Sequence, residues 1–473
     1  MASPLFLLCF MLYISHSSQM ILLPLTHSFS KTQFNSTHNL LKSTSTRSAA
    51  RFHSKTKGQE VSLPLSPGSD YTLSFNIGSH PSQTITLYMD TGSDLVWFPC
   101  APFECILCEG KPKTTKPPNI TKAHTVSCQS HACSSAHASM SSRDLCAIAR
   151  CPLDSIETSD CSSFSCPPFY YAYADGSFIA RLFRDTLSVS SSLLLKNFTF
   201  GCSHTALAEP TGVAGFGRGL LSLPAQLATF NPQLGNRFSY CLVSHSFDEE
   251  RVRRPSPLIL GSYGGGGGEP AAFAYTSMLP NPKHPYFYCV GLVGISVGKQ
   301  TIPAPEMLSR VNGRGDGGMV VDSGTTFTML PASLYNSVVA EFDRRVGRVN
   351  KRASEVEVKT GLGPCYYLDG AVEVIPTVTL HFVGNYSNVV LPRKNYFYEF
   401  LDVGDGGRRK RKVGCMMLMN GGDEADLSGG PWATLGNYQQ QGFEVLYDLE
   451  NQRVGFARRQ CSSLWDSLHH EKN

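Results

Sequence analysis

The sequence predicts a mainly β protein built from two similar lobes. Short runs of alternating polar and apolar residues, such as YTLSFNIGS and QTITLYMD, recur along the chain with turn residues between them. The 473 residues include 42 glycines and 29 prolines, which favours many turns and short strands over long helices. The two halves also share a short sequence pattern, described below. Because a single domain of this length would be unusual, we expect two lobes.

Composition and charge exclude several classes of protein. Hydrophobic residues make up 41% and charged residues 16% of the chain, so most of it should fold rather than remain disordered. The formal net charge of +4 is small for this length and creates no strong field. Dedicated nucleic-acid binding is therefore not implied.

The N-terminal region is typical of an exported precursor. The run LFLLCFMLYI at residues 5–14 is long enough for a secretory signal and too short to span a bilayer. We expect the signal to end near residue 24, although a second apolar patch at residues 21–25 blurs that boundary. Six basic and no acidic residues precede Glu60, which suggests a removable basic prosegment over residues 25–60. The alternatives are a disordered tail and, because this region is also rich in Ser and Thr, a plastid transit peptide.

Cysteines and sequons favour the export route. The chain has sixteen cysteines, a number that suits disulfides in an oxidising compartment. Asn-X-Ser/Thr triplets are compatible with the same route, and the glycosylation candidates are Asn119, Asn197 and Asn385, with a fourth triplet at Asn35. No later segment is apolar enough for a membrane span, and no lipid-anchor signal is present. We expect a soluble, monomeric protein that is extracellular or vacuolar rather than plastidial.

The lobes are divided by a glycine-rich stretch. Residues 61–262 should form the first lobe, with a cysteine-rich insertion at 100–166, and residues 270–465 the second. The stretch 263–269 is the expected linker, and residues 466–473 form a polar tail. Further strands are expected at residues 188–200, 286–297, 319–329, 374–383 and 443–456, and a helix at residues 332–345.

Two matching motifs relate the halves and carry the candidate chemistry. Each follows an apolar strand, and they are Asp90-Thr91-Gly92-Ser93 and Asp322-Ser323-Gly324-Thr325. A glycine after a strand allows a tight turn, and small hydroxylated neighbours can donate hydrogen bonds without blocking a carboxylate. One such match would be weak evidence, but two in the same context suggest that two loops bring two carboxylates together.

A close pair of carboxylates is suited to acid–base catalysis. Two like charges about 3 Å apart repel by roughly 5 kcal/mol at an effective dielectric constant near 20, so the pair shares one proton. The ionised carboxylate can deprotonate a water molecule while the protonated one donates to a peptide carbonyl. This chemistry hydrolyses a peptide bond without a covalent enzyme intermediate and needs no cofactor or metal.

From about Tyr71 to Cys461 the chain resembles a pepsin-type aspartic protease of the plant nepenthesin-like group. The two Asp motifs, the segments GVAGFGRG and ATLGN, and phrases such as FGCSH, FSYCL, GISVG and NYQQQGFEVLYD carry this resemblance. It implies a two-lobed pepsin-like β fold that binds an extended peptide in a cleft between the lobes. A peptide or protein is then the expected substrate.

The resemblance also implies roles for individual residues. Asp90 and Asp322 correspond to the catalytic pair, and the small residues around them would support it: Thr91, Gly92, Ser93, Ser323, Gly324 and Thr325. Tyr173 in YADGS corresponds to the tyrosine of a flap that closes over substrate, and Trp97 resembles the tryptophan beneath it. Cys365 and Cys415 resemble a family disulfide.

The cysteine pattern departs from the group. The insertion holds nine cysteines, more than the seven expected, so Cys146 and Cys151 could form an extra bridge. Cys289 stands where an apolar residue is usual and is the candidate unpaired thiol, buried rather than reactive. A zinc site among the cysteines of residues 100–133 is a minor alternative that the absence of paired Cys/His ligand spacing disfavours, so no metal is expected.

Two functional alternatives remain open. Xylanase-inhibitor-like relatives keep this fold as catalytically silent binding proteins, although here both aspartates are present. The basic run Arg408–Lys412, together with the transit-like N-terminus, leaves a DNA-associated plastid protease as a minor alternative. A solvated loop tip is the simpler interpretation of the basic run.

Overall fold

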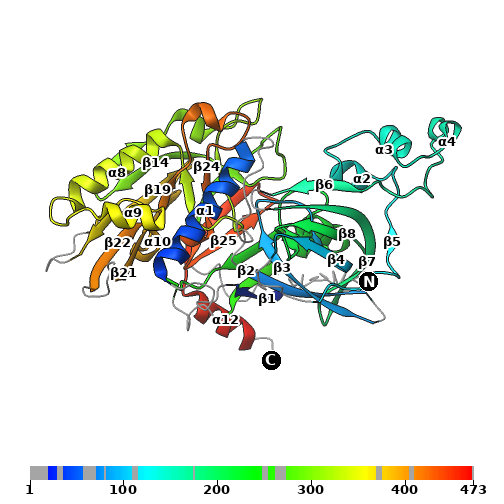
Figure 1. Ribbon diagram of the computed structural model, residues 1–473, viewed down its shortest axis with the longest axis horizontal. Helices are drawn as coiled ribbons and strands as arrows, with labels where there is room; N and C mark the ends of the chain where they lie inside the picture. The colour runs from blue at the N-terminus through cyan, green and yellow to red at the C-terminus, as the bar shows by residue number, and fades with distance from the viewer. Residues whose placement is uncertain are drawn as a thin grey trace, which may run out of the picture.

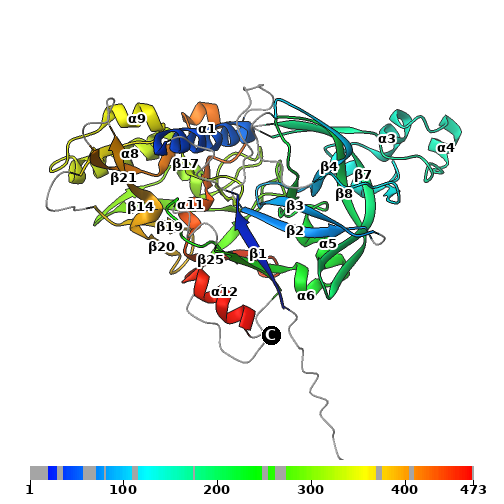
Figure 2. The ribbon, with the colours of Figure 1, turned by 60° about the horizontal axis from the view of Figure 1, so that its bottom comes forward.

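The computed structural model describes residues 20–28, 36–56, 71–78, 81–108, 116–173, 176–247, 254–261, 273–368, 375–403 and 410–470. Two β-rich lobes lie side by side, and the helices α2 to α4 project from the far end of the N-terminal lobe (Figures 1 and 2). The prediction of a mainly β, two-lobed pepsin-like fold is confirmed. The expected signal segment before Met20 and the glycine-rich linker lie outside the described residues.

The elements of the N-terminal lobe follow the alternating patterns of the sequence. Its strands and helices are β2 (Tyr71–Ile77), β3 (Gln83–Asp90), β4 (Trp97–Ile106), β5 (His124–Thr125), α2 (His131–Ala136), α3 (Ser142–Ile148), α4 (Leu153–Glu157), β6 (Phe169–Ala172), β7 (Ser177–Ser190), β8 (Leu193–Leu207), β9 (Val213–Gly215), α5 (Leu223–Phe230), α6 (Pro232–Gly235), β10 (Arg237–Cys241) and β11 (Ser256–Gly261). In β2 the buried residues alternate with exposed ones from Leu73 to Ile77, because one face of the strand packs on the core.

The C-terminal lobe is also built mainly of strands, but it carries different additional helices and strands. Its elements are β12 (Ala274–Leu279), β13 (Cys289–Val290), β14 (Leu292–Val297), β15 (Gln300–Pro303), β16 (Met319–Val321), β17 (Thr328–Leu330), α8 (Ala332–Val346), α9 (Ser354–Thr360), β18 (Cys365–Tyr367), β19 (Val378–Phe382), β20 (Asn388–Leu391), α10 (Arg393–Tyr396), β21 (Phe397–Val403), β22 (Lys410–Met416), β23 (Leu418–Asn420), β24 (Ala433–Leu435), α11 (Asn437–Gln440), β25 (Phe443–Asp448), β26 (Arg453–Arg458) and α12 (Cys461–His470). The expected helix at 332–345 is α8, and part of the expected polar tail belongs to α12.

A six-strand antiparallel ladder joins the lobes. The strands pair in the order β1 (Met20–His27), β11, β10, β25, β26 and β12. Three of these strands precede the expected linker and three follow it, so both halves of the chain contribute to one sheet. Phe238 of β10 stacks on Tyr447 of β25, with ring centroids 4.6 Å apart, in the core of this sheet. The floor beneath the two aspartate loops is therefore shared by the lobes.

The second apolar patch of the N-terminal region, at residues 21–25, forms part of strand β1. Ile21, Leu23 and Leu25 are buried, and β1 pairs with β11 along six residues and with β2 at Thr26. The expected signal boundary near residue 24 falls inside this strand. Alternation of buried residues through Leu25 is that of a strand packed on a core, so the folded part of the chain begins no later than Met20.

The segment before the first lobe also contains a long helix that the sequence analysis did not anticipate. Helix α1 (Thr37–Thr56) lies across the C-terminal lobe in both views (Figures 1 and 2). Leu40, Leu41 and Phe52 are buried there in a cluster with Phe327 and Met419 of that lobe. The alternative of a disordered, solvated tail does not hold for residues 36–56.

Seven disulfides connect the described cysteines. Five lie in or beside the insertion: Cys100–Cys202, Cys105–Cys108, Cys128–Cys146, Cys133–Cys166 and Cys151–Cys161. The suggested Cys146–Cys151 bridge is wrong, because each of these cysteines has another partner. Cys365–Cys415 is present as expected, Cys241–Cys461 links β10 to α12, and Cys289 is buried and takes part in none of these disulfides, as predicted.

Candidate active site

The two aspartate loops occupy equivalent places in the two lobes. Strand β3 ends at Asp90 and pairs in parallel with β9, where Asp90 lies opposite Gly215. Strand β16 ends one residue before Asp322 and pairs in parallel with β24. The segments GVAGFGRG and ATLGN thus flank the loops, and both aspartates are fully buried.

The glycines of the motifs let the two carboxyl groups approach each other. A Cβ atom on Gly92 would lie 2.7 Å from Asp322 Cγ, and one on Gly324 would collide with Asp90 Oδ1. No side chain fits at either position without displacing the opposite carboxylate. The glycine of each loop therefore makes room for the aspartate of the other.

Each carboxylate receives matching hydrogen bonds within its own loop. Ser93 Oγ donates to Asp90 Oδ2 at 2.6 Å, and Thr325 Oγ1 donates to Asp322 Oδ2 at the same distance. The backbone N–H of Gly92 donates to Asp90 Oδ1 at 2.9 Å, and that of Gly324 to Asp322 Oδ1 at 2.7 Å. In each loop the hydroxyl and the backbone N–H together stabilise an ionised carboxylate and fix its orientation.

Thr91 and Ser323 brace the loops against each other. The N–H of Thr91 donates to Ser323 Oγ at 3.0 Å, and the N–H of Ser323 donates to Thr91 Oγ1 at 2.9 Å. The two hydroxyls then donate across the interface, Thr91 to Val321 O and Ser323 to Met89 O. These four bonds hold the relative position of the loops.

Buried polar residues beneath the loops extend this brace. Tyr447 Oη lies 3.4 Å from Thr91 Oγ1 and 2.9 Å from Tyr240 Oη. Gln440 Nε2 donates to Asp322 O at 3.3 Å, and Asn437 Nδ2 donates to Ser323 O at 2.9 Å. The segment NYQQQGFEVLYD served above only as a mark of the subgroup. The polar residues inside this otherwise apolar stretch are the signal that could have indicated their supporting role.

Tyr173 and Trp97, the two residues expected at the flap, lie in contact. Tyr173 follows β6 in the β6–β7 hairpin, and its Oη accepts a hydrogen bond of 2.9 Å from Trp97 Nε1. Trp97 is fully buried and stacks on Phe178, with ring centroids 3.8 Å apart. Burial raises the pKa of Tyr173 far above its ordinary value, so the phenol stays neutral. The hairpin thereby presents a neutral hydroxyl near Asp90.

Arg51 of helix α1 lies against both aspartates of the two loops. Its Nη2 is 2.5 Å from Asp90 Oδ2, and its Nε is 3.5 Å from Asp322 Oδ2. The side chain is only 8% exposed, so these charges interact with little screening by water. The predicted basic prosegment over residues 25–60 did not single out any residue, and the structure places Arg51 beside the two aspartates.

Other contacts hold α1 on the C-terminal lobe. His38 Nε2 lies 3.1 Å from Asp402 Oδ1, and the N–H of Phe327 donates to Ser48 Oγ at 3.0 Å. Ser45 Oγ donates to Thr360 O at 2.9 Å. Together with the apolar contacts of Phe52, these bonds fix the helix so that Arg51 faces the aspartates.

Asp94 is a further buried carboxyl beside the first catalytic loop. Its Oδ2 accepts a hydrogen bond of 3.3 Å from the N–H of Leu221, and the absence of a side chain at Gly219 leaves room for it. Its Oδ1 is buried and has no hydrogen-bond partner in the described parts of the chain. Burial raises the pKa of Asp94 to about 6, against the opposing effect of the backbone N–H groups of Leu221 and Gly219.

This carboxyl should make stability depend on pH. Its pKa is higher in the folded state than in the unfolded chain, so its stabilising contribution is complete below about pH 4 and is lost as pH rises through about 6. The Asp94→Asn variant has no carboxyl group to ionise at this position. The difference in unfolding free energy between this variant and the wild type should therefore shift by about 2 kcal/mol in favour of the variant from pH 4 to pH 7.

Urea unfolding at the two pH values measures this gain. The exposed residue Asp160 provides the control, and Asp160→Asn should change the unfolding free energy equally at both values. An equal change for Asp94→Asn at pH 4 and pH 7 would show that the carboxyl does not titrate in this range.

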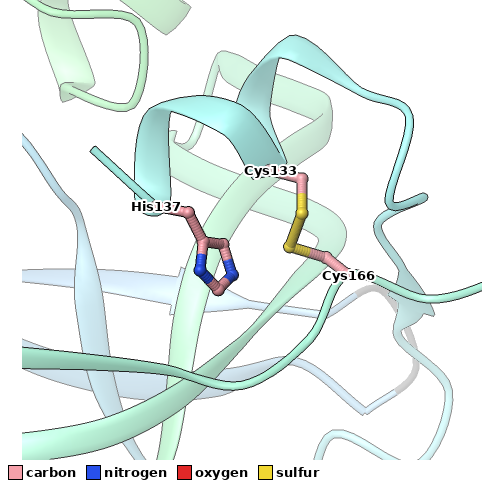
Figure 3. Close-up of side chains that lie close together, drawn as sticks. All are labelled: Cys133, His137 and Cys166. Atoms are coloured by element: carbon pink, nitrogen blue, oxygen red, sulfur yellow. A yellow bond between two sulfur atoms is a disulfide. The ribbon is translucent and has the colours of Figure 1, made fainter. Parts of the chain in front are cut away.

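Two described cysteines and one histidine bring three possible ligand atoms together, but these residues do not form a metal site. Cys133, His137 and Cys166 lie with their ligand atoms within 4.8 Å of one another (Figure 3). Figure 3 shows that the two sulfur atoms are bonded to each other, so neither is available as a thiolate. A ring nitrogen of His137 lies 3.2 Å from Pro167 O. The arrangement is a structural disulfide with a neighbouring histidine.

The described part of the basic run belongs to a strand rather than to a loop tip. Lys410, Arg411 and Lys412 are in β22, while Arg408 and Arg409 lie outside the described residues. Lys412 forms an ion pair of 2.8 Å with Glu399, and the Arg411 guanidinium lies 3.4 Å from the centre of the Tyr367 ring. These two cations are engaged within the lobe, which weakens their case as a nucleic-acid surface.

None of the helices in the described ranges is long and apolar enough to cross a membrane.

Comparisons with known proteins agree on one family. The family model "Xylanase inhibitor N-terminal" matches residues 71–262, and "Xylanase inhibitor C-terminal" matches residues 287–458. A probable aspartyl protease of Arabidopsis thaliana is 62% identical over 429 residues, covering 86% of this chain and 85% of the relative. Aspartic proteinase nepenthesin-2 of Nepenthes gracilis is 29% identical over 411 residues, covering 85% of this chain and 81% of the relative.

Solved structures show the same fold at low identity. The structure of edgp has a TM-score of 0.60 at 17% identity, covering 95% of this chain and 97% of its own. Basic 7S globulin from soybean also has a TM-score of 0.60, at 18% identity, covering 94% of this chain and 99% of its own.

Proposed function

Because this chain belongs to the plant pepsin-type aspartic proteases, we propose that it is an aspartic endopeptidase, active at acid pH and made as an inactive precursor. The observation that carries the proposal is the complete pair of loops around Asp90 and Asp322, with every supporting hydrogen bond present in both lobes. Related names alone would not support catalysis.

The loop geometry supports a water-activating mechanism. One carboxylate of the pair takes a proton from a water molecule held between the two, and that water attacks the carbonyl carbon of the substrate. The other carboxyl group donates its proton to the carbonyl oxygen, which gives a neutral tetrahedral intermediate. Proton transfer to the amide nitrogen then breaks the C–N bond. The braces at Thr91 and Ser323 hold the two loops in a fixed relative position, which favours this sharing of protons.

Helix α1 supports the proposal of an inactive precursor. Arg51 lies against both carboxyl groups, so a substrate carbonyl and its water cannot occupy the same place. Protonation of the carboxyls in acid weakens their attraction for the guanidinium, which favours release of the helix. We expect the mature chain to begin after α1, and residues 57–70 lie outside the described residues.

The expected route of the protein is export to the cell exterior or the vacuole. Seven disulfides suit an oxidising compartment, and the candidate glycosylation residues Asn119, Asn197 and Asn385 are all exposed. Action as a monomer on peptide substrates, without nucleic acid, remains part of the proposal.

Cleavage of a denatured protein between pH 3 and pH 7, with and without pepstatin, tests the function. The processed enzyme should cleave in acid and lose activity near neutrality. Correctly folded, processed protein that cleaves no peptide at any pH would instead favour a silent binding protein on this fold, as the xylanase-inhibitor description of the family models suggests.

A further inference from the structure

A cationic cavity of about 500 Å³ lies at the start of helix α12. Its wall is built by segments that are far apart in sequence: the residues after β10, the entry to β11, helix α10, the end of β26 and the first turn of α12. The basic residues among those that line it are Arg254, Lys394, Arg458 and Arg459. Helices α12 and α1 lie on opposite sides of the molecule (Figure 2), so this cavity is separate from the catalytic pair.

The charge of the cavity is only partly neutralised. Arg459 forms an ion pair of 3.1 Å with Glu444, which also accepts a hydrogen bond from Ser239. Arg254 and Arg458 form no ion pair with any described residue. Among the described residues, these two guanidinium groups therefore have no carboxylate partner and can attract an anion.

Arg458 is held in position although no carboxylate binds it. Its Nη1 donates to Gly442 O at 2.9 Å, and the guanidinium lies 5.2 Å from the centre of the Phe443 ring. Gly442 has a φ of +72°, and a Cβ there would lie 2.5 Å from Arg458 Nη1. The glycine thus makes room for the guanidinium. Burial lowers the pKa of Arg458, which reflects the cost of holding this charge partly away from water.

Helix α12 adds oriented donors to the same cavity. The N–H of Leu464 is bonded to Gln460 O, so the helix begins with Cys461, and both Cys461 and Ser462 line the cavity. The first N–H groups of a helix lack partners within it and carry the positive end of its dipole. The Cys241–Cys461 disulfide ties this turn to β10. Ser244 also lines the cavity, and its hydroxyl has no hydrogen-bond partner among the described residues.

We propose that this cavity binds a multivalent oxyanion, namely the phosphate or sulfate group of a ligand. Planar guanidinium groups and backbone N–H donors match the several oxygens of a tetrahedral anion better than they match a halide. The site is assembled from fixed elements and does not depend on the chemistry of the catalytic pair.

Calorimetric titration of the full chain with inorganic phosphate, and separately with inorganic sulfate, tests the site. The chain carries Asp322→Asn so that it cannot cleave itself. Saturable binding should be weakened about tenfold or more in Arg458→Gln and in Arg254→Gln. The matched control is Arg310→Gln, which removes an exposed arginine that pairs with Glu306, and it should bind as the parent does.

The phosphate and sulfate titrations distinguish two classes of ligand. Tighter binding of phosphate points to a phosphorylated ligand, and tighter binding of sulfate to a sulfated one. Absence of saturable binding of both ions, or equal heats with chloride at matched ionic strength, overturns the proposal. Arg458 donates a hydrogen bond to Gly442 O and Arg254 makes no such bond among the described residues, so Arg254→Gln is expected to fold even where Arg458→Gln does not. Unchanged affinity in a folded Arg254→Gln chain would place the anion elsewhere.

Discussion

The variants Asp90→Asn and Asp322→Asn are each expected to lose acid proteolysis by roughly a thousandfold or more. An amide in place of either carboxyl can neither take a proton from water nor share one with its partner. Because the two residues act as one unit, the double variant should be no worse than the single ones by more than a small factor. Rates of cleavage of a denatured protein at pH 3 to 5 measure the loss.

The loss must be separated from unfolding. Asp154→Asn, at an exposed position of the insertion, is the matched control and should retain full activity. Thermal unfolding should show that both dyad variants are folded, since the asparagine oxygen can still accept from the backbone N–H of Gly92 or Gly324, and the hydroxyl of Ser93 or Thr325 can turn to accept from the amide group. A variant that kept a tenth of the wild-type rate would show that this aspartate is not part of the catalytic pair.

The Arg51→Gln precursor is expected to mature at a less acidic pH than the wild type. The guanidinium interacts with both carboxyls in a buried setting, so its loss removes the attraction that resists release near neutrality. Conversion at pH 6 should be faster by on the order of tenfold to a hundredfold. Because the attraction itself weakens as acid protonates the carboxyls, the difference should shrink toward pH 3. Appearance of the shortened chain on a gel, alongside peptide cleavage, gives both rates.

Lys42→Gln is the matched control for this experiment. Lys42 lies on the same helix and is exposed, so its loss removes one positive charge without touching the aspartates. Its precursor should convert as the wild type does. If Arg51→Gln also converted at the wild-type rate at every pH, the contact with the dyad would not control maturation, and the apolar packing of Phe52 would be the remaining restraint.

The two aspartate loops could be predicted from the sequence because their hydrogen bonds are local. Asp90 and its supporting groups lie within four consecutive residues, and the same holds for Asp322. The flap partner could be placed by the same kind of short motif, and the Trp97–Tyr173 hydrogen bond is present in the structure. In contrast, the polar support beneath the loops comes from Tyr240 and Tyr447, which are 207 residues apart. No short sequence pattern could have predicted that these two tyrosines form a hydrogen bond.

Helix α1 shows why the inhibitory contact was not predicted in detail. Its sequence is rich in Ser and Thr and has little apolar periodicity, so it does not resemble a stable helix. It is held as a helix because Leu41 and Phe52 pack on the other lobe, and tertiary packing supplies most of the stability of such helices. Arg51 is 271 residues from Asp322 in the chain, so only the folded path brings them together.

The sequence by itself determined the β class, the two related lobes and the two aspartate loops, because alternation, turn residues and short motifs act over a few residues. Tertiary structure alone decided which cysteines of the insertion pair, how Asp94 is buried, where Arg51 lies and which cations surround the start of α12. These features depend on contacts between distant segments and on the removal of charges from water. Both arise only when the chain has folded, and that is the physical reason why local patterns could not specify them.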